Sequence, residues 1–492
     1  MEHRSVEWQE RFCREQKPEA CRIVIFGASG DLAKRKLFPA LAALDERGLL
    51  AAASRIVGCA RHAYDDASFR AHIAAHLPAP PAAAGERFLN RIGYVPLDYA
   101  RPEDYRNLAS LVCERSENCP LIFYLALPAA LYPEVVRQLS AAGLLRETPE
   151  SGARRVVFEK PFGHDPASAA ALDAELRRHL EEHQIYRIDH YLGKETVQNI
   201  FLLRFANRIF EPVWNAAQVD SIQITVAEQL GVEQRAGYFD RAGLLRDMFQ
   251  NHLLEMLALV TMECPQTFSA DAVRDEKVKL IRSIRPIDPA DAVRAQYEGY
   301  RAEPGVAPDS RTETYAALKL FIDNWRWQGV PIYLRAGKKL GIRRTEIDIV
   351  FKPVPHSVFP GIPQEALQPD ILHLNVQPEE GIGLTLQAKK PGPKLCMGAL
   401  TLHYDYRESG GEALDAYARL LLDCQLGDQT LFIRSDVIAA AWQLYQPLLD
   451  RWAADAETPL PTYLPGSEGP REAARLLARD GRAWNDELAA ES

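Results

Sequence analysis

The chain has 492 residues, more than the roughly 250 to 300 at which one hydrophobic core stops growing, so we expect two domains. Hydrophobic residues make up 47% and charged residues 25%, and no apolar run reaches the roughly 18 residues of a membrane span. A net charge of -9 argues against nucleic acid as a partner, because such binding neutralises phosphates with clustered cations. We expect a cytoplasmic protein without a membrane or nucleic-acid partner.

The first 16 residues are polar and contain no apolar stretch followed by a small-residue cleavage site, so we expect no secretory signal. The eight cysteines, among them Cys13, Cys21, Cys59 and Cys424, form no Cys-x-x-Cys pair and no set at metal-ligand spacing. We therefore expect reduced, buried thiols and no metal site.

The first half of the chain alternates apolar runs with helical patterns. Runs rich in Ile and Val at 21–26, 55–60, 121–127 and 154–159 predict strands. Leucines recur at helical spacing from Leu37 to Leu44, Gly48 follows as a stop signal, and Pro39 could bend this helix. Strands that alternate with helices pair in parallel, which predicts a doubly wound α/β sheet with 78–85 as a surface loop.

After about residue 190 the pattern changes to alternating strands, at 221–228, 347–351 and 372–377, separated by long helices. This pattern is typical of a mixed, mostly antiparallel sheet, and the last forty residues predict a peripheral helix and tail. We predict an N-terminal extension (1–20), a Rossmann-like nucleotide-binding domain (21–188) and a larger β+α domain for substrate binding and oligomerisation (189–492).

A glycine turn follows the first predicted strand and opens a helix. Such a turn brings little side-chain bulk and helix N-terminal amides to a pyrophosphate, although Ser29 and Leu32 break the usual G-x-G-x-x-G pattern. A purely structural turn is the alternative. The cofactor contacts that we predict here are Gly27, Ser29, Gly30, Asp31 and Leu32.

The end of the second predicted strand bears on the choice of cofactor. An NAD enzyme usually carries an acid there, but this chain has Arg61, whose cation favours the 2′-phosphate of NADP. Asp45 and Glu46 lie at the end of a predicted helix, where we expect them to be solvated. NADP is the expected cofactor, with NAD as a secondary one.

Several longer segments are similar to those of glucose-6-phosphate dehydrogenases. They are GASGDLAKRKLFPAL (27–41), EKPFGHD (159–165), RIDHYLGKE (187–195), GYFDRAGLLRDMFQNHLLE (237–255), residues 312–340 and DQTLFIRSD (428–436). The resemblance spans about residues 21 to 450, and RIDHYLGKE is its most specific part.

The resemblance implies oxidation of glucose 6-phosphate at C1 to the lactone with NADP, the first step of the oxidative pentose phosphate pathway, by a homodimer or homotetramer. It implies Asp189 and His252 as the catalytic dyad. It places His190, Tyr191, Lys194, Lys338 and Arg343 around the substrate phosphate, and Lys160, Glu228 and Asp247 at the sugar hydroxyls.

The chemistry agrees with a histidine base that works near neutral pH, although a lone histidine on a predicted helix is ordinarily structural. Asp247 lies five positions before His252, roughly 140° away on α-helical geometry, so Asp189 at a strand end is the better orienting carboxylate. The alternative role of Asp189 is a helix N-cap ahead of Tyr191.

The basic residues allow similar alternatives. His190 and Lys194 are four apart, which predicts one helical face that is either a phosphate cradle or a surface ion-pairing face. The cluster from Lys338 to Arg343 is either a second cradle segment or a solvated loop. Lys160 should lie at the carboxyl end of a strand, close to both cofactor and substrate, and its bond to Pro161 is a candidate for the cis form.

Other functions remain open at this point. One is a dehydrogenase of another hexose phosphate or one that uses both NAD and NADP. Another is a nucleotide-binding homologue without catalysis, and the weakest is a nucleic-acid binder that uses the basic run 34–36.

Overall fold

The computed structural model describes residues 16–78, 83–113, 119–148, 151–394, 396–406 and 414–485. The chain forms two compact units. Unit 1 contains the described residues up to Gly193 together with Thr267–Arg274 and Leu414–Ile438. Unit 2 contains Lys194–Gln266 and the described parts of 275–413 and 439–492. The functional boundary at 188/189 stays a prediction, because contacts alone do not define a functional domain.

Unit 1 is built on a six-stranded parallel sheet with the order β3-β2-β1-β4-β5-β6. Its strands are β1 (Arg22–Phe26), β2 (Arg55–Ala60), β3 (Ile92–Pro96), β4 (Leu121–Leu125), β5 (Arg154–Phe158) and β6 (Ile185–Arg187). The doubly wound parallel sheet is thereby confirmed, and the four predicted strands agree with β1, β2, β4 and β5 to within two residues.

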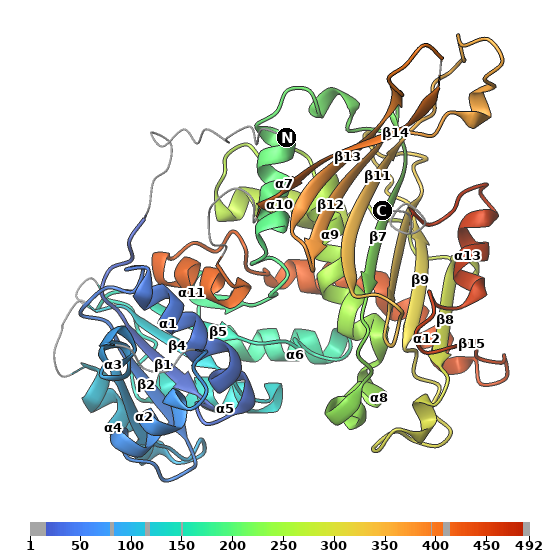
Figure 1. Ribbon diagram of the computed structural model, residues 1–492. Helices are drawn as coiled ribbons and strands as arrows, with labels where there is room; N and C mark the ends of the chain where they lie inside the picture. Colours follow the sequence, from blue (N-terminus) through green and yellow to red (C-terminus); the bar gives the residue numbers. More distant parts are fainter. Residues whose placement is uncertain are drawn as a thin grey trace. The chain divides into compact units, whose positions relative to one another are not determined.

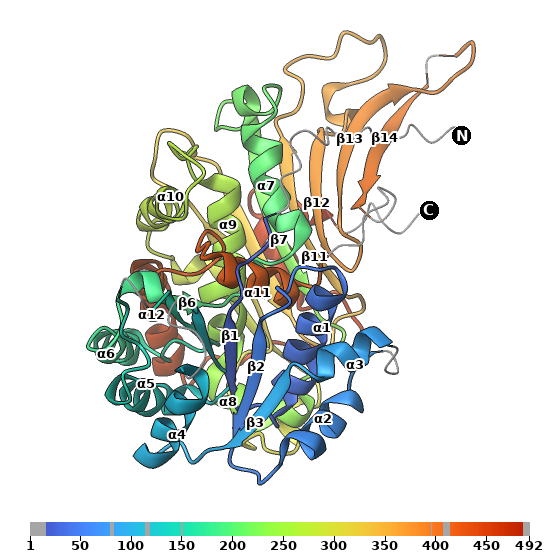
Figure 2. The same cartoon turned by 90° about the vertical axis from the view of Figure 1, so that its left-hand side faces the viewer.

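Helices cover both faces of this sheet, with α4 to α6 on one side and α1 to α3 on the other (Figure 2). The helices are α1 (Phe38–Glu46), α2 (Asp66–Ala74), α3 (Ala83–Leu89), α4 (Pro102–Cys113), α5 (Tyr132–Ala141), α6 (Pro166–Leu176) and α11 (Ala416–Leu426). Buried side chains of these helices, such as Tyr105, Leu139 and Leu176, belong to one hydrophobic cluster with Val24 and Phe123 of the sheet.

The helix predicted after the glycine turn consists of a short π-helix, η2 (Ala33–Leu37), and then α1. Pro39 lies in the first turn of α1, where proline is tolerated, and Gly48 follows the helix with a φ of 71°. Part of the predicted loop 78–85 lies outside the described residues, but from Ala83 onward it belongs to α3 rather than to a loop.

Unit 2 contains a nine-stranded sheet with the order β14-β13-β12-β11-β7-β10-β9-β8-β15 (Figure 1). Its strands are β7 (Val219–Ala227), β8 (Ala292–Tyr297), β9 (Tyr315–Leu320), β10 (Ile332–Gly337), β11 (Arg344–Phe351), β12 (Ile371–Gln377), β13 (Gly381–Lys389), β14 (Met397–Asp405) and β15 (Thr462–Tyr463). Only β10 with β7 and β15 with β8 pair in parallel among these strands, which confirms the mixed, mostly antiparallel sheet.

The remaining helices are α7 (Glu195–Phe205), α8 (Ala236–Leu244), the π-helix η7 (Leu245–Leu253), α9 (Leu254–Thr261), α10 (Ala270–Arg282), α12 (Ser435–Ala454) and α13 (Arg471–Ala478). Even single turns of π-helix are rare, and they frequently accompany functional sites. The nine-residue π-helix η7 is therefore a candidate location for functional residues. Of the helices that the structure describes, none combines the length and apolar character needed to cross a membrane.

The cysteines agree only in part with the expected buried thiols. Seven of them are described and all seven are free. Cys21, Cys59 and Cys424 are buried, and burial raises the pKa of the Cys21 thiol to about 12. Cys113, Cys264 and Cys396 are exposed.

Candidate active site

The glycine turn of unit 1 lies at the carboxyl end of β1. Gly27 has a φ of 76°, and a Cβ atom there would lie 2.3 Å from the carbonyl oxygen of Ala126, so only glycine fits. The Gly27 amide donates to the carbonyl of Cys59 (2.8 Å), and the Gly30 amide donates to the carbonyl of Gly27 (2.9 Å). The turn is thus held between the ends of β2 and β4.

This position is the topological switch point of the sheet, because the chain proceeds outward from β1 to β2 and β3 and then returns to β4 on the other side of β1. Open α/β sheets bind dinucleotides in the crevice at such a point. The tight turn and the absent side chain at Gly27 fit the close approach that a pyrophosphate needs.

Other predicted cofactor residues surround this turn. Arg61 follows β2 directly and is exposed. The Ser29 hydroxyl lies 3.3 Å from Nδ1 of His62, a neighbour that the sequence did not indicate. Leu32 is the N-cap residue of η2. Asp31 forms an ion pair with Arg35 (2.9 Å), which belongs to the basic run 34–36. That local pairing and the helical position of the run weaken its interpretation as a nucleic-acid surface.

The expectation of a solvated Asp45 is wrong. The side chain of Asp45 is only 2% exposed, and one carboxylate oxygen lies 3.1 Å from Arg91. Arg91 follows α3 and supplies the countercharge that burial of a carboxylate requires. Glu46, the next residue, is exposed as expected.

β5 ends at Phe158, so Glu159 and Lys160 lie at its carboxyl end, where Lys160 was predicted. The Lys160–Pro161 bond is cis. Glu159 is held by two tyrosines: the Tyr124 hydroxyl donates to Oε1 (2.5 Å), and the Tyr132 hydroxyl donates to the main-chain carbonyl (2.7 Å). Burial raises the pKa of the Glu159 carboxyl, although the tyrosine hydrogen bond opposes this effect.

The most specific motif forms a turn after β6. Asp189 is buried, and its Oδ1 accepts a hydrogen bond from the Tyr191 amide (3.0 Å). The predicted helical face for His190 and Lys194 is wrong, since α7 begins only at Glu195. The helix starts late because Lys194, its N-cap residue, has an extended backbone conformation.

One residue near this turn was missed by the sequence analysis. Tyr417, at the start of α11, stacks on His190 with ring centroids 6.2 Å apart and an interplanar angle of 8°. A Cβ atom at Gly193 would lie 2.5 Å from the carbonyl oxygen of Ala416, so α11 approaches the turn closely. No local pattern announces this contact, because Tyr417 is more than 220 positions from His190.

In unit 2 the structure brings three of the predicted substrate residues together. Nζ of Lys338 lies 2.5 Å from Oε2 of Glu228 and 3.8 Å from Oδ2 of Asp247, at the end of β10. The ammonium also lies 5.1 Å above the ring of Phe239. Two carboxylates and an aromatic face hold this lysine in place, and the same carboxylates offer acceptors for hydroxyl groups.

The other cations on and beside the predicted stretch from Lys338 to Arg343 lie in different surroundings, and so does Lys194. Lys339 pairs with Glu303 (2.8 Å), Arg344 with Glu346 (3.2 Å), and Arg335 donates to the Thr225 hydroxyl (3.0 Å). Arg343 is exposed in the turn after β10. Lys194 lies 3.9 Å from Glu380. Lys194, Lys339 and Arg344 therefore pair with carboxylates other than Glu228 and Asp247, the partners of Lys338.

His252 is buried within η7, and its amide donates to Oδ1 of Asn251 (2.7 Å). Because η7 is a π-helix, with hydrogen bonds from residue i to i+5, the α-helical angle that separates Asp247 from His252 does not apply to this segment. Asp247 nevertheless has a partner of its own in Lys338.

A glycine turn at the switch point of a parallel sheet assigns unit 1 to the dinucleotide-binding class of α/β folds. Residues 24–199 match the model described as the NAD binding domain of glucose-6-phosphate dehydrogenase, and residues 201–485 match that of its C-terminal domain. The chain belongs to the glucose-6-phosphate dehydrogenase family.

Individual relatives agree with this membership. The chain is 44% identical to the glucose-6-phosphate 1-dehydrogenase of Aggregatibacter actinomycetemcomitans, over 95% of this chain and 98% of that one. It is 43% identical to the enzyme of the same name from Mycolicibacterium smegmatis, with the same coverage. A solved structure of glucose-6-phosphate dehydrogenase in complex with glucose 6-phosphate is 36% identical, with a TM-score of 0.89 over 96% of this chain and 100% of that chain.

Proposed function

We propose that the chain oxidises glucose 6-phosphate at C1 to 6-phosphogluconolactone, with hydride transfer to a nicotinamide dinucleotide and NADP as the preferred form. Family membership carries this proposal, since both domain models match in order and relatives above 40% identity are named glucose-6-phosphate 1-dehydrogenase. The reaction is the first step of the oxidative pentose phosphate pathway.

The reaction takes two hydrogens from the sugar. The hydrogen on C1 leaves with its electron pair as hydride, the O1 hydroxyl loses a proton, and C1 becomes the lactone carbonyl. When bound, the nicotinamide ring accepts the hydride. The protein has to take the proton, and we assign that role to the imidazole of His252. Asp189 would hold the imidazole in the productive tautomer, and its own carboxylate is oriented by the Tyr191 amide.

The remaining predicted residues fall into two groups. We assign His190, Tyr191, Lys194 and Arg343 to the substrate phosphate, which cations and ring N–H groups recognise. We assign Lys160, Glu228, Asp247 and Lys338 to the sugar hydroxyls. The contacts of Lys338 with both carboxylates support moving it from the phosphate group of residues to the hydroxyl group.

The preference for NADP rests on the end of β2. An exposed arginine at this strand end can pair with a 2′-phosphate, whereas an acid there would accept hydrogen bonds from the ribose hydroxyls of NAD. Gly27, Ser29, Gly30, Asp31 and Leu32 would approach the pyrophosphate from the switch point, with Lys160 close to the nicotinamide end.

A spectrophotometric assay of nicotinamide reduction tests the proposal. We expect turnover of glucose 6-phosphate with NADP at a much higher kcat/KM than with NAD, and little turnover of galactose 6-phosphate or free glucose. A preference for free glucose would overturn the assignment of a phosphate site. Equal use of both cofactors would overturn only the preference for NADP.

A homo-oligomer and a cytoplasmic location complete the proposal. Support for self-association comes from β14 at the edge of the unit 2 sheet, where Leu400 and Leu402 are 49% and 53% exposed. An apolar edge strand is a surface that proteins normally cover. Light scattering at micromolar concentration tests self-association, and the mass of a single chain would contradict it.

A further inference from the structure

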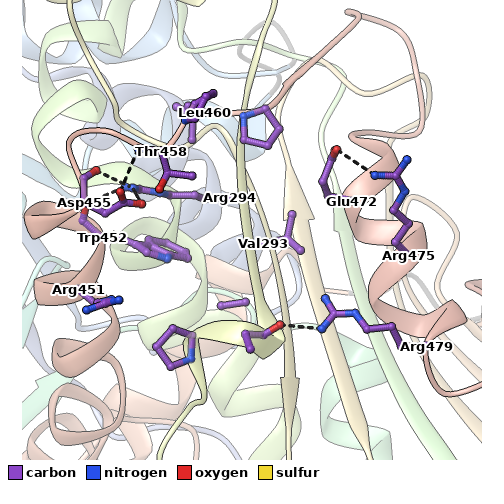
Figure 3. Close-up of a pocket in the computed structure, with 15 residues that line it drawn as sticks. Val293, Arg294, Arg451, Trp452, Asp455, Thr458, Leu460, Glu472, Arg475 and Arg479 are labelled. Carbon is purple, nitrogen blue, oxygen red and sulfur yellow. Dashed lines mark hydrogen bonds and ion pairs between the residues drawn. The ribbon is translucent and has the colours of Figure 1, made fainter.

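Unit 2 contains a pocket of about 570 Å³ between β8, the C-terminal end of α12, the segment that follows α12, and α13 (Figure 3). This volume lies within the range of roughly 300 to 1,000 Å³ that small-molecule sites occupy. None of the residues assigned above to substrate or cofactor lines it. The pocket therefore needs an explanation of its own.

The lining carries an excess of positive charge, with four arginines against two carboxylates in a chain whose net charge is -9. Arg294 is part of the pocket floor: it donates to the carbonyl of Trp452 (2.9 Å), pairs with Asp455 (3.3 Å) and lies 5.4 Å above the Trp452 ring. Its side chain is only 11% exposed. This arginine shapes the site rather than binding a ligand.

The other three arginines lie on two walls: Arg451 is on α12, Arg475 is on α13, and Arg479 is the C-cap residue of α13 (Figure 3). All three are exposed. Arg479 uses one N–H on the carbonyl of Ala290 (2.9 Å), and Arg475 lies 3.8 Å from Glu472 in an ion pair that solvent weakens. A guanidinium has five N–H groups, so these side chains retain donors for a planar or tetrahedral anion.

Most of the remaining lining is apolar, with Thr458 as its polar member. The apolar part consists of Trp452, Val293, Leu460, two alanines and three prolines, Pro289, Pro459 and Pro461, whose rings make the surface stiff. Such a surface favours a flat apolar body over a sugar, whose hydroxyl groups would lose hydrogen bonds to water there. The combination of arginines with this surface fits a phosphate ester that carries an aromatic base.

We propose that this pocket is a second ligand site that binds a nucleotide, with its phosphates on Arg451, Arg475 and Arg479 and its base against Val293 and Leu460. The lining continues directly toward the substrate residues of unit 2. Pro461 precedes β15, which pairs with β8, and the Tyr463 hydroxyl in β15 donates to the carbonyl of Lys338 (2.6 Å). A ligand that shifts the segment 458–461 therefore acts on the backbone that positions Lys338.

This coupling rests on the proposed role of Lys338 in substrate binding, whereas binding to the pocket does not. A bound nucleotide should change the KM for glucose 6-phosphate more than kcat. The reason is that Lys338 and its partners Glu228 and Asp247 are assigned to the sugar hydroxyls, which they would already contact in the ground state.

Calorimetric titration of the full chain with ATP, and separately with inorganic pyrophosphate, tests the site. We expect ATP to bind the wild type and the double variant R451E/R475E to lose at least tenfold in affinity. Arg471→Glu is the matched control, with the same charge change on α13 at a residue that does not line the pocket, and it should bind as the wild type does. Leu460→Trp, which fills the pocket without changing its charge, should also weaken ATP.

Equal ATP affinity in the wild type, R451E/R475E and L460W, or no binding to the wild type, would overturn the site. Pyrophosphate that binds as tightly as ATP would overturn the role of the base. The KM for glucose 6-phosphate measured with and without saturating ATP tests the coupling. A change of threefold or more that disappears in R451E/R475E supports it, and an unchanged KM overturns it while the calorimetric result on the site stands.

Discussion

His252 can be tested apart from substrate binding, because a base that accepts the O1 proton acts mainly in the transition state. Asparagine at this position keeps a polar side chain of similar size but cannot accept a proton near neutral pH. We expect His252→Asn to lower kcat about 10²- to 10⁴-fold and to change the KM for glucose 6-phosphate little. Steady-state kinetics measure both values. His356→Asn, in an exposed loop, should keep wild-type turnover, and undiminished turnover of H252N would remove His252 from the mechanism.

Arg61 offers a second test at the level of a single residue. Only NADP carries the 2′-phosphate, so loss of the guanidinium should remove a charge-assisted contact of roughly 1.5 to 3 kcal/mol from NADP and none from NAD. We expect Arg61→Ala to raise the KM for NADP about 10- to 100-fold and that for NAD less than threefold. Arg106→Ala, an exposed arginine on α4 that pairs with Glu103, is the control. Equal effects on both cofactors would refute the assignment.

The elements of the fold differ in how well local sequence predicts them. Four strands of unit 1 are mainly apolar runs of five or six residues: β1, β2, β4 and β5. A short apolar run bounded by turn residues is typical of a buried strand, so the sequence predicts these elements well. β6 has only three residues, too few to show a pattern. The π-helix η7 was predicted as an ordinary helix, since its apolar residues do not distinguish the two helix types. Met248 and Phe249 of η7 are buried, as the apolar face of an α-helix in the same place would also be.

The sheet of unit 2 contains a titratable network that should make stability depend on pH. Nδ1 of His373 in β12 lies 2.6 Å from Oδ1 of Asp348 in β11, and Nε2 lies 3.0 Å from the Thr385 hydroxyl in β13. Burial alone would lower the pKa of His373, but the Asp348 carboxylate and the nearby Glu346 outweigh burial and Arg344, so the pKa is raised. The charged imidazolium is therefore favoured in the folded chain.

A raised pKa in the folded state adds stability below the unfolded value of about 6.5, and this stability is lost as the pH rises through the folded value. We expect the denaturant midpoint of unit 2 to fall between about pH 6 and pH 8.5 more steeply in the wild type than in His373→Gln. Tryptophan fluorescence during urea unfolding at both pH values measures the difference. Parallel pH profiles of the two proteins would show that His373 does not contribute.

At the scale of the whole molecule, the sequence predicted which residues belong to the candidate site better than it predicted their contacts with one another. The sequence placed Lys160 and Asp189 at strand ends, where the structure has them, because the end of a strand is a local property. It did not find Tyr417 beside His190 or the two carboxylates around Lys338, because these contacts join segments more than 90 residues apart. Long-range contacts depend on the tertiary fold, which no local pattern encodes.

The assigned cofactor contacts gather at the ends of β1 and β2, whereas the assigned substrate contacts lie in other segments apart from the shared Lys160. The two ligands should therefore protect different segments most strongly. A ligand at 100 times its Kd stabilises the state that binds it by about 2.7 kcal/mol. We expect NADP to slow amide hydrogen exchange most strongly in peptides that cover β1, the Gly27 turn and β4. Glucose 6-phosphate should act most strongly on peptides that contain the His190–Tyr191 turn, Glu228 and Lys338. Exchange measured by mass spectrometry reports both effects.

The variants described above serve as controls for this experiment. In R61A the protection by NADP should weaken, whereas the protection of the Lys338 peptide by glucose 6-phosphate should persist, because Arg61 has no assigned contact with the sugar. H252N should keep both protections if His252 acts only on the proton. NADP that protects the strands of unit 2 as strongly as β1 and β4 would contradict the assignment of its binding to the switch point, since a ligand stabilises most the segment whose opening abolishes its site.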